Sequence, residues 1–309
     1  MAKQGVIKVE NLSKRFGELV AVDSISFEIY EREIFGILGP NGAGKTTALE
    51  IIEGLQKPTS GKTFVFGKET HNNDRAIKEK IGIQLQSTSF FDFLNLKEIL
   101  EVYGSFYPSH QDPMQLLEMV GLKEKAKTVV KKLSGGQKQR FAVVSTLINN
   151  PQVVFLDEPT TGLDPQARRN LWEIIETMRQ SGKTVILTTH YMDEAQILCD
   201  RVAIMDEGKI VALDTPERLI RSLKYPYRAL VKTNGRFPLS EVSELKGVVE
   251  VRERAEEGRY EIRLEDNLEG LSESRKYFAK KNIKIKDLKL ETADLEDVFI
   301  HFTGKRLRD

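Results

Sequence analysis

The sequence predicts an α/β protein with a second, smaller α+β domain. One observation is a set of short, almost wholly apolar runs separated by helical stretches, which is typical of parallel strands covered on both faces. The second is an N-terminal region in which apolar and polar residues alternate, and the third is a return to alternating strands near the C-terminus. The apolar runs are IFGILG (34–39), VVFLD (153–157), TVILTTH (184–190) and RVAIMD (201–206).

Length and composition favour two hydrophobic cores. The chain has 309 residues, 40% of them hydrophobic, and a single core rarely grows beyond roughly 250 residues. The 47 basic and 46 acidic residues leave a formal charge of +1, so we expect no nucleic-acid partner. No run approaches the roughly 20 apolar residues that span a bilayer, so the chain is not itself a channel. The single cysteine, Cys199, excludes an intrachain disulfide and suits a reducing cytosol.

The first domain is expected over residues 1–225. Its N-terminal segments VIKVENL and LVAVDSISFEI carry the alternation of half-buried strands, which we expect to pair antiparallel. Residues 87–150 lack buried-strand runs and have the pattern of helices. This predicts a helical lobe inserted into the α/β core.

The second domain is expected over residues 226–309. Four alternating strands, RALVKT, VVEVRER, RYEIRLE and IKIKDLKLE, are interrupted by the helical segments SEVSELK and LEGLSESRKYFAKK. The order βαββαβ predicts a small ferredoxin-like α+β domain, closed by the amphipathic segment ADLEDVFIHF. The sequence does not choose whether this domain regulates, dimerises or supports a partner contact.

A glycine-rich loop lies between the first apolar strand and a helical segment, the setting that a phosphate-binding loop requires. The glycines let backbone N–H groups turn inward, and the following helix adds the positive end of its dipole. The lysine can reach β and γ phosphates, and the next hydroxyl is placed as a Mg²⁺ ligand. The loop residues are Gly39, Pro40, Asn41, Gly42, Ala43, Gly44, Lys45, Thr46 and Thr47.

Two adjacent carboxylates, Asp157 and Glu158, end the strand VVFLD. Ligands collect at the carboxyl ends of strands in open α/β sheets. We expect Asp157 to hold the Mg²⁺ shell and Glu158 to orient or deprotonate an attacking water. Alone, such a pair would suggest a helix cap or a solvated turn. Its position after a phosphate-binding loop in the sequence favours a catalytic role.

The motif LSGGQ, with Ser134, Gly135, Gly136 and Gln137, precedes an amphipathic helix and again exposes backbone N–H groups at a helix N-terminus. With this motif the chain resembles the ATP-binding cassette (ABC) family, over roughly residues 5–225. The resemblance implies a P-loop NTPase core of the ABC ATPase type, with an antiparallel β subdomain and a helical lobe.

The resemblance also implies a second ABC ATPase subunit as partner, in a homodimer. In this family two cassettes pair head to tail, and Ser134 and Gly136 would contact the γ-phosphate of ATP held by the other subunit. Asp164, in TTGLDP, resembles the aspartate that links the two sites. Without the family, Asp164 before Pro165 would be read as a helix N-cap.

Three further residues match family positions in order. Phe16 resembles the aromatic residue that stacks on adenine, Gln86 in IGIQLQ the glutamine that joins Mg²⁺ to the permease contact, and His190 the histidine that positions the water. Gln84 is an alternative for Gln86. Taken singly, Phe16 would be read as core and His190 as structural.

The stretch after His190 and the terminal TADLEDVFIHFTG are similar to bacterial multidrug, antibiotic and sodium exporter ATPases that serve ABC-2-type permeases. This resemblance implies an ATPase, with ATP and Mg²⁺ as cofactors, that couples ATP-driven dimer closure to export by a separate integral membrane permease. It also implies a cytoplasmic protein, peripheral on the inner face of the cell membrane.

Two other functions compete with transport. A non-transport ABC ATPase acting on the ribosome or DNA would share the same motifs, but about 90 residues separate Lys45 and Ser134, too few for a long coiled coil. Ribosome-associated members usually carry two cassettes, and this chain carries one. A P-loop kinase is opposed by LSGGQ and His190.

The helical lobe is the candidate contact with a permease. The run Phe90-Phe91-Asp92-Phe93-Leu94 follows Gln86 and is rich in aromatic residues. Exposed, it would be a docking patch. The alternative is that these aromatic side chains fill the core of the lobe.

Overall fold

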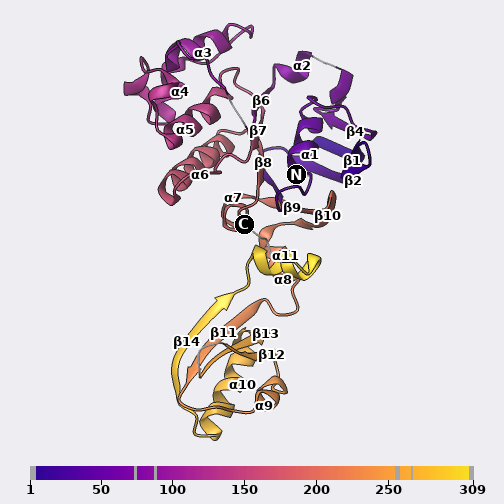
Figure 1. Cartoon of the computed structure of the whole chain (residues 1–309), viewed down its shortest axis with the longest axis vertical. Helices are drawn as coiled ribbons and strands as arrows, with labels where there is room; N and C mark the ends of the chain where they lie inside the picture. The colour runs from indigo at the N-terminus through magenta and orange to yellow at the C-terminus, as the bar shows by residue number, and fades with distance from the viewer. Residues whose placement is uncertain (1–4, 73–74, 87–88, 255–257, 266, 306–309) are drawn as a thin grey trace. The chain divides into compact units, whose positions relative to one another are not determined.

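The computed structural model describes residues 5–72, 75–86, 89–254, 258–265 and 267–305. The chain divides into two compact units, Met1–Thr215 and Pro216–Asp309 (Figure 1). The predicted domain boundary, after residue 225, lies ten residues further along the chain than the end of the first unit. Between the two positions, helix α8 (Pro216–Arg221) packs against α11 (Leu295–Thr303) within the second unit.

The N-terminal strands form a four-stranded antiparallel sheet in the order β2-β1-β4-β5. Its long strands are joined by a tight turn and pair from Gly5 opposite Tyr30 to Phe16 opposite Leu19, which confirms the antiparallel prediction. The strands are β1 (Gly5–Phe16), β2 (Leu19–Tyr30), β4 (Ser60–Val65) and β5 (Lys68–Glu69).

The second sheet has six strands in the order β10-β9-β3-β8-β7-β6, parallel except for the β9–β10 pair. Every residue of β3, β7 and β8 is buried, as the apolar runs predict. The short strand β6 was not predicted, since IGIQ is too brief and mixed to read as a buried run. The strands are β3 (Ile34–Leu38), β6 (Ile81–Gln84), β7 (Val153–Asp157), β8 (Thr184–Thr189), β9 (Arg201–Asp206) and β10 (Lys209–Asp214).

The core of this unit joins the two sheets through apolar side chains of β1, β2, β3 and α1. The rings of Phe27 and Phe35 stack with centroids 5.4 Å apart and bring β2 against β3. This packing fixes the loop between β3 and α1 relative to the sheet edge.

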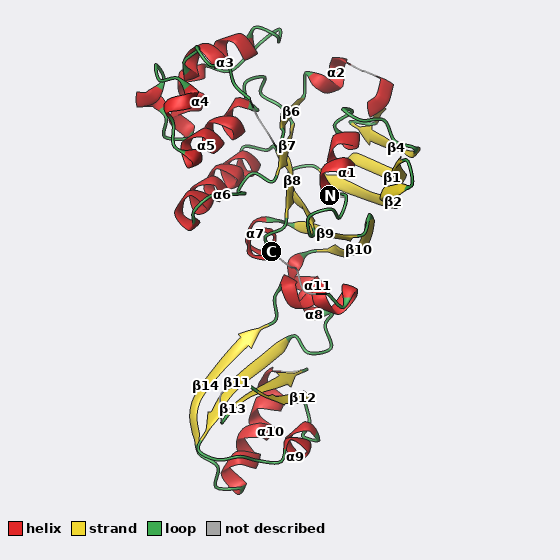
Figure 2. Cartoon of the chain, viewed as in Figure 1, coloured by secondary structure: helices red, strands yellow, loops and turns green. Residues whose placement is uncertain are grey.

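Helices α3, α4 and α5 gather in one lobe of the unit, in the region predicted to be helical (Figure 2). Capping explains where two of them begin: Asn95 and Glu98 form a reciprocal capping box on α3, and Ser134 and Gln137 do the same on α5. Residues 87–88, in the predicted lobe, lie outside the described residues. The helices of the unit are α1 (Lys45–Ile52), α2 (Arg75–Lys78), α3 (Leu96–Gly104), α4 (Pro113–Met119), α5 (Gly135–Ser145), α6 (Pro165–Gln180) and α7 (Met192–Leu198), with 3₁₀ turns at Thr70–Asn72, Lys123–Lys125 and Val130–Lys132.

The C-terminal unit contains an antiparallel sheet in the order β12-β13-β11-β14, with α9 and α10 between the strands in sequence. This is the ferredoxin-like arrangement predicted from the strand order. Its core holds Tyr260, Val242 and Phe278. The elements are β11 (Tyr227–Thr233), α9 (Leu239–Ser243), β12 (Val248–Glu253), β13 (Arg259–Leu264), α10 (Asn267–Lys280) and β14 (Ile285–Thr292).

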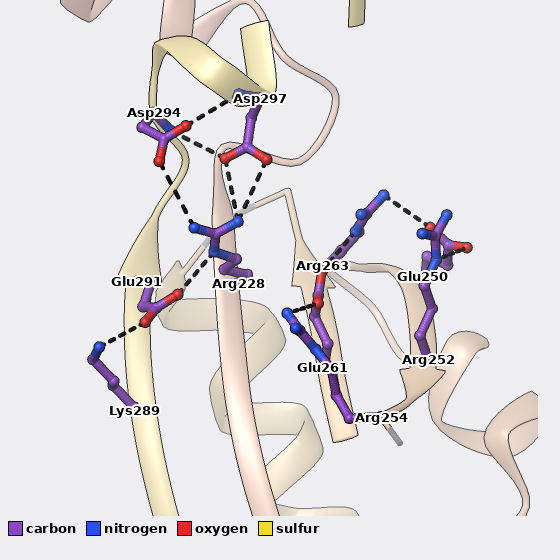
Figure 3. A network of polar contacts seen from close by, with 10 residues as sticks. All are labelled: Arg228, Glu250, Arg252, Arg254, Glu261, Arg263, Lys289, Glu291, Asp294 and Asp297. Atoms are coloured by element: carbon purple, nitrogen blue, oxygen red, sulfur yellow. Dashed lines mark hydrogen bonds and ion pairs between the residues drawn. The ribbon is translucent and has the colours of Figure 1, made fainter. Parts of the chain in front are cut away.

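Charged side chains on the strands of this C-terminal sheet pair with one another and with the start of α11 (Figure 3). Arg228 on β11 lies 2.9 Å from Glu291 on β14 and 3.3 Å from Asp297 at the start of α11. Arg263 on β13 lies 3.2 Å from Glu250 on β12. These pairs join β11 to β14 and β13 to β12.

Within the described residues, no helix combines the length and the apolar character needed to cross a membrane.

Candidate active site

The loop between β3 and α1 forms a close-fitting cradle of backbone. Gly44 has φ +96°, and a Cβ there would lie 2.2 Å from the carbonyl oxygen of Ala21. A Cβ on Gly39 would lie 2.3 Å from the carbonyl oxygen of Met205. Both positions therefore exclude a side chain, and the loop ends directly on the N-terminus of α1, where backbone N–H groups favour anions.

Lys45, the first residue of α1, is buried with 4% of its surface exposed. Its Nζ donates to the carbonyl oxygens of Gly39 at 2.9 Å and Pro40 at 3.1 Å. The same ammonium lies 3.3 Å from Oε1 of Glu158. A buried cation supported mainly by carbonyl oxygens and one carboxylate is well placed to take up an additional anion.

Asp157 ends strand β7 and faces the start of α1. Its Oδ1 accepts a hydrogen bond from the Thr46 hydroxyl at 3.2 Å and another from the Thr188 hydroxyl of β8. Burial raises the pKa of Asp157, while the hydrogen bonds from Thr188 and Thr46 oppose that rise. A hydroxyl and a carboxylate thus meet at one point, and both are hard oxygen donors.

Glu158 adopts a left-handed backbone conformation, with φ 46°. Its N–H donates to Thr188 Oγ1 at 2.9 Å, and its Oε2 accepts from the Thr161 hydroxyl at 3.0 Å. A non-glycine residue in this conformation is strained, and such strain is concentrated at functional sites. The hydrogen bonds hold the strained residue in place.

The charge state of Glu158 is set by opposing effects. Burial raises its pKa, but the Lys45 ammonium, the Thr161 hydroxyl and His190 together hold that pKa below its ordinary value. His190 Nδ1 lies 3.4 Å from Glu158 Oε2. Glu158 is therefore an ionised carboxylate at neutral pH, with an imidazole beside it that can orient a water or exchange a proton.

The structure brings together five of the predicted site residues from three separate segments of the chain. Lys45 and Thr46 come from α1, Asp157 and Glu158 from the end of β7, and His190 from the end of β8. All stand at the carboxyl edge of the parallel strands, as the order of motifs predicts. Asn41 and Gly42 are exposed in the loop between β3 and α1, where Ala43 is buried and Thr47 half-buried on the first turn of α1.

The other predicted residues stand apart from this cluster. Ser134 and Gly135 are exposed, and Gly136 and Gln137 half-buried, at the start of α5 in the helical lobe. Asp164 caps α6 by accepting from the backbone N–H groups of Gln166 and Ala167. Phe16 ends β1 with 48% of its surface exposed. Gln86 is exposed after β6.

Several polar residues of the site were not singled out in the sequence. Thr188 binds both acidic residues, and Thr161 binds Glu158. Thr188 could have been found, since TVILTTH places threonines at the end of an otherwise apolar strand. Gln84, the alternative to Gln86, is buried at the end of β6 with its Nε2 3.5 Å from the carbonyl oxygen of Asp157.

Comparisons with known proteins agree with this geometry. The family model described as ABC transporter matches residues 22–161. The Nod factor export ATP-binding protein I of Paraburkholderia xenovorans (strain LB400) is 34% identical over 99% of both chains. The linearmycin resistance ATP-binding protein LnrL of Bacillus subtilis (strain 168) is 33% identical over 98% of this chain and 100% of its own. These comparisons give no support to a ribosomal or DNA-associated function.

Solved structures share the fold of the first unit. One is cbiO1 from Clostridium perfringens, part of the ABC transporter complex cbiONQ, with 28% identity and a TM-score of 0.64 over 71% of this chain and 92% of that one. Another is the dimeric ATP-binding cassette MJ0796 bound to ADP and Pi, with 29% identity and a TM-score of 0.62 over 68% of this chain and 98% of that one. Together with the two full-length relatives, they establish that the chain belongs to the ABC transporter family, as an ATP-binding and ATP-hydrolysing subunit.

Proposed function

We propose that the chain works as a pair of cassettes that hydrolyse Mg²⁺-bound ATP to drive an integral membrane permease of an export system. The observation that carries the proposal is the cluster in which Lys45 lies 3.3 Å from Glu158, beside the Thr46–Asp157 hydrogen bond. The names of the full-length relatives, one for Nod factor export and one for linearmycin resistance, support export as the coupled process. The chemical identity of the exported substrate follows from neither.

The residues around Lys45 fit a nucleotide with its magnesium ion. The side-chain-free cradle at Gly39 and Gly44 leaves backbone N–H groups for phosphate oxygens, and the Lys45 ammonium can exchange its carbonyl partners for β and γ phosphates. Thr46 and Asp157 supply the hard oxygens that Mg²⁺ prefers. When bound there, Mg²⁺ would neutralise phosphate charge and orient the nucleotide.

Glu158 is the proposed general base. Its carboxylate is ionised at neutral pH, is anchored by Thr161 and is strained at the backbone, so it has little freedom to move away from a water placed before it. His190, whose Nδ1 lies 3.4 Å from Glu158 Oε2, would help to hold that water or the γ-phosphate. General-base assistance is typically worth 10²–10⁴-fold in rate.

The exposed residues of the signature motif support pairing of two chains. Ser134 and Gly135 present an exposed helix N-terminus in the helical lobe, on a different element from the Lys45 cluster. A second copy would place its bound ATP against this surface, with Asp164 linking the two sites and Phe16 stacking on adenine. This arrangement makes each hydrolytic site depend on both subunits.

The aromatic run of the helical lobe divides between core and surface. Phe90 packs on the buried ring of Phe141, with centroids 5.0 Å apart, whereas Phe91 and Phe93 are 50% and 93% exposed. Phe90 and Phe91 line a pocket of about 450 Å³ together with Gln84 and Gln86. We propose that a helix of the permease docks here, so that Gln86 connects docking to the Mg²⁺ site.

The docking proposal is tested with exposed aromatic residues. Phe91→Ala and Phe93→Ala are expected to weaken association with the permease, while Phe106→Ala, at an exposed ring outside the run 90–94, leaves it unchanged. Association is measured by recovery of the complex from membranes. Unchanged recovery of the folded Phe91→Ala and Phe93→Ala proteins would contradict docking at this patch.

The proposed function itself is tested by purifying the tagged full-length chain from solubilised membranes and identifying the proteins that accompany it. An integral membrane protein in stoichiometric amount is expected. Recovery of ribosomes or DNA alone would overturn the transport role. It would not bear on ATP hydrolysis, which the Glu158→Gln protein tests separately.

A further inference from the structure

Glu194, in the first turn of α7, is a buried carboxylate to which the sequence assigned no role. None of its surface is exposed. Its Oε1 accepts a hydrogen bond from the indole Nε1 of Trp172 on α6 at 2.8 Å. Trp172 is the only tryptophan of the chain. Burying a carboxylate against a neutral indole donor destabilises the fold, which suggests that the position of this side chain serves a function.

The surroundings of Glu194 include both catalytic loops. Burial raises its pKa, and the hydroxyls of Thr189 and Thr160, with the Trp172 indole, oppose that rise. Thr189 directly precedes His190, and Thr160 follows Glu158 by two positions. Both threonines are buried. One carboxylate therefore lies next to the residue before the histidine, to the loop after the glutamate and to helix α6.

A second contact joins α6 to His190. The guanidinium of Arg168 lies 4.0 Å above the ring of Tyr191, and its Nη1 lies 3.3 Å from Asp193. The Tyr191 ring in turn lies 4.1 Å from the imidazole of His190. Cation–π and ring contacts of this kind restrict the rotation of the side chains involved. His190 is thus connected to α6 through the stacked side chains of Tyr191 and Arg168, as well as through Glu194.

The N-terminal end of α6 faces the signature motif. A Cβ on Gly136 would lie 3.2 Å from the Cβ of Ala167, so the start of α5 packs closely against the first turn of α6. Asp164 caps the same turn. Helix α6 therefore contacts both the signature motif and the support of His190.

From these contacts we infer that Glu194 is a positioning residue: through its hydrogen bond with Trp172 it fixes the His190 loop and the Glu158 loop to helix α6. It does not touch the reacting atoms. The inference rests on the roles proposed above for Glu158 and His190. It predicts that the Trp172–Glu194 bond affects turnover and not nucleotide binding, because the phosphate cradle and Lys45 lie on other elements.

The test uses the full-length chain and measures kcat, KM for ATP and the dissociation constant of ATP with Mg²⁺ present. Trp172→Phe removes the donor and keeps an aromatic ring, and Glu194→Ala removes the acceptor. Both are expected to lower kcat by roughly 10-fold, since small misplacement of catalytic groups reduces rates by up to about 10²-fold. Nucleotide affinity is expected to stay within about twofold, because the phosphate cradle and the bonds from Lys45 to the carbonyl oxygens of Gly39 and Pro40 lie outside the loops that Glu194 holds.

Two variants sharpen the test. Glu194→Gln keeps an oxygen that accepts from the indole and is expected to retain most of the turnover. Glu173→Gln changes an exposed glutamate next to Trp172 and is expected to behave as wild type. Since Trp172 is the only tryptophan, its fluorescence emission reports the bond directly and is expected to shift in Glu194→Ala and not in Glu173→Gln.

Wild-type kcat in a folded Trp172→Phe protein would overturn the inference, as would a loss of nucleotide affinity that parallels the loss of kcat. An unchanged emission spectrum in Glu194→Ala would overturn it too. If Glu194→Ala does not fold, the kcat values of Trp172→Phe and Glu194→Gln still test whether the Trp172–Glu194 hydrogen bond affects turnover. Rapid turnover by a Glu158→Gln protein in the same assay would instead refute the proposed site roles, so the two failures are distinguishable.

Discussion

The two units of the chain carry their charges in opposite ways. In the first unit, Lys45, Asp157 and Glu158 are buried together at a sheet edge, with 4%, 4% and 8% of their surfaces exposed. In the second, Arg228, Arg263 and their acidic partners lie along a sheet surface and form pairs between strands (Figure 3). Buried charge is destabilising unless it is paired or binds a ligand, whereas ion pairs on a partly exposed surface contribute roughly 0–1 kcal/mol each. The first unit therefore carries a buried cluster suited to catalysis, whereas the ion pairs of the second unit join neighbouring strands.

The largest effect is expected from a change at the buried site. Glu158→Gln keeps the shape of the side chain and removes its charge, so we expect ATP turnover to fall by about 10²–10⁴-fold while ATP stays bound. The matched change in the second unit, Glu261→Gln, alters a buried glutamate paired with Arg263 and is expected to leave turnover unchanged. Phosphate release measured under the same conditions compares them. Equal effects of the two substitutions would remove the distinction between the units.

Loss of nucleotide affinity is the next effect in size. Lys45→Ala removes the ammonium from the phosphate cradle, and a hydrogen bond to a charged group is worth about 1.5–3 kcal/mol. We expect ATP to bind about 10–100-fold more weakly, as measured by equilibrium titration. Arg263→Ala, a cation of the second unit, serves as control. Wild-type affinity in Lys45→Ala would contradict the placement of phosphates at this loop.

A pH-dependent effect on stability is expected from Glu53, at the C-terminal end of α1. Burial, together with the charges of Asp157 and Glu50, raises its pKa to about 8. Because the folded-state pKa lies above the unfolded value of 4.5, this group favours the fold below pH 4.5, and that contribution is lost as the pH rises to about 8. The second unit has no comparable group among its described residues.

Glu53→Gln removes this titration. We expect its Tm to exceed that of the wild type at pH 9 and the difference to shrink as the pH falls towards 5, at about 1.4 kcal/mol per unit of pKa shift. Thermal unfolding at several pH values measures it, with Glu173→Gln as an exposed control. Parallel curves of Tm against pH for wild type and Glu53→Gln would contradict a raised pKa of Glu53 in the folded protein.

The smallest effect is expected in the second unit. Arg228→Ala breaks the pairs with Glu291 and Asp297 on a partly exposed sheet surface. We expect a loss of about 1 kcal/mol in the free energy of unfolding and no change in ATP turnover. Chemical denaturation and phosphate release give the two values. A large fall in turnover would mean that the second unit takes part in the chemistry.

The same contrast explains how much could be predicted from sequence. The parallel strands of the first unit are buried apolar runs, and the motifs around Lys45, Asp157 and Ser134 require particular residue types at fixed spacing. The fold, and the meeting of Lys45 with Asp157 and Glu158, could therefore be predicted. The βαββαβ order of the second unit followed from alternation alone.

What escaped prediction depends on contacts between distant segments. The pairing of Thr188 with Asp157 and of Trp172 with Glu194 joins residues that no local pattern connects. Strand β6 escaped prediction because four residues carry too little periodicity, and the packing of α8 with α11 joins segments about 80 residues apart in the sequence.

The central claim is that two copies of this chain close over ATP and that Glu158 ends that state by hydrolysis. Sedimentation of the Glu158→Gln protein with Mg²⁺ and either ATP or ADP tests it most directly. We expect a dimer that holds ATP in each subunit when ATP is present, and a monomer with ADP. A monomer under both conditions, with ATP bound, would contradict it.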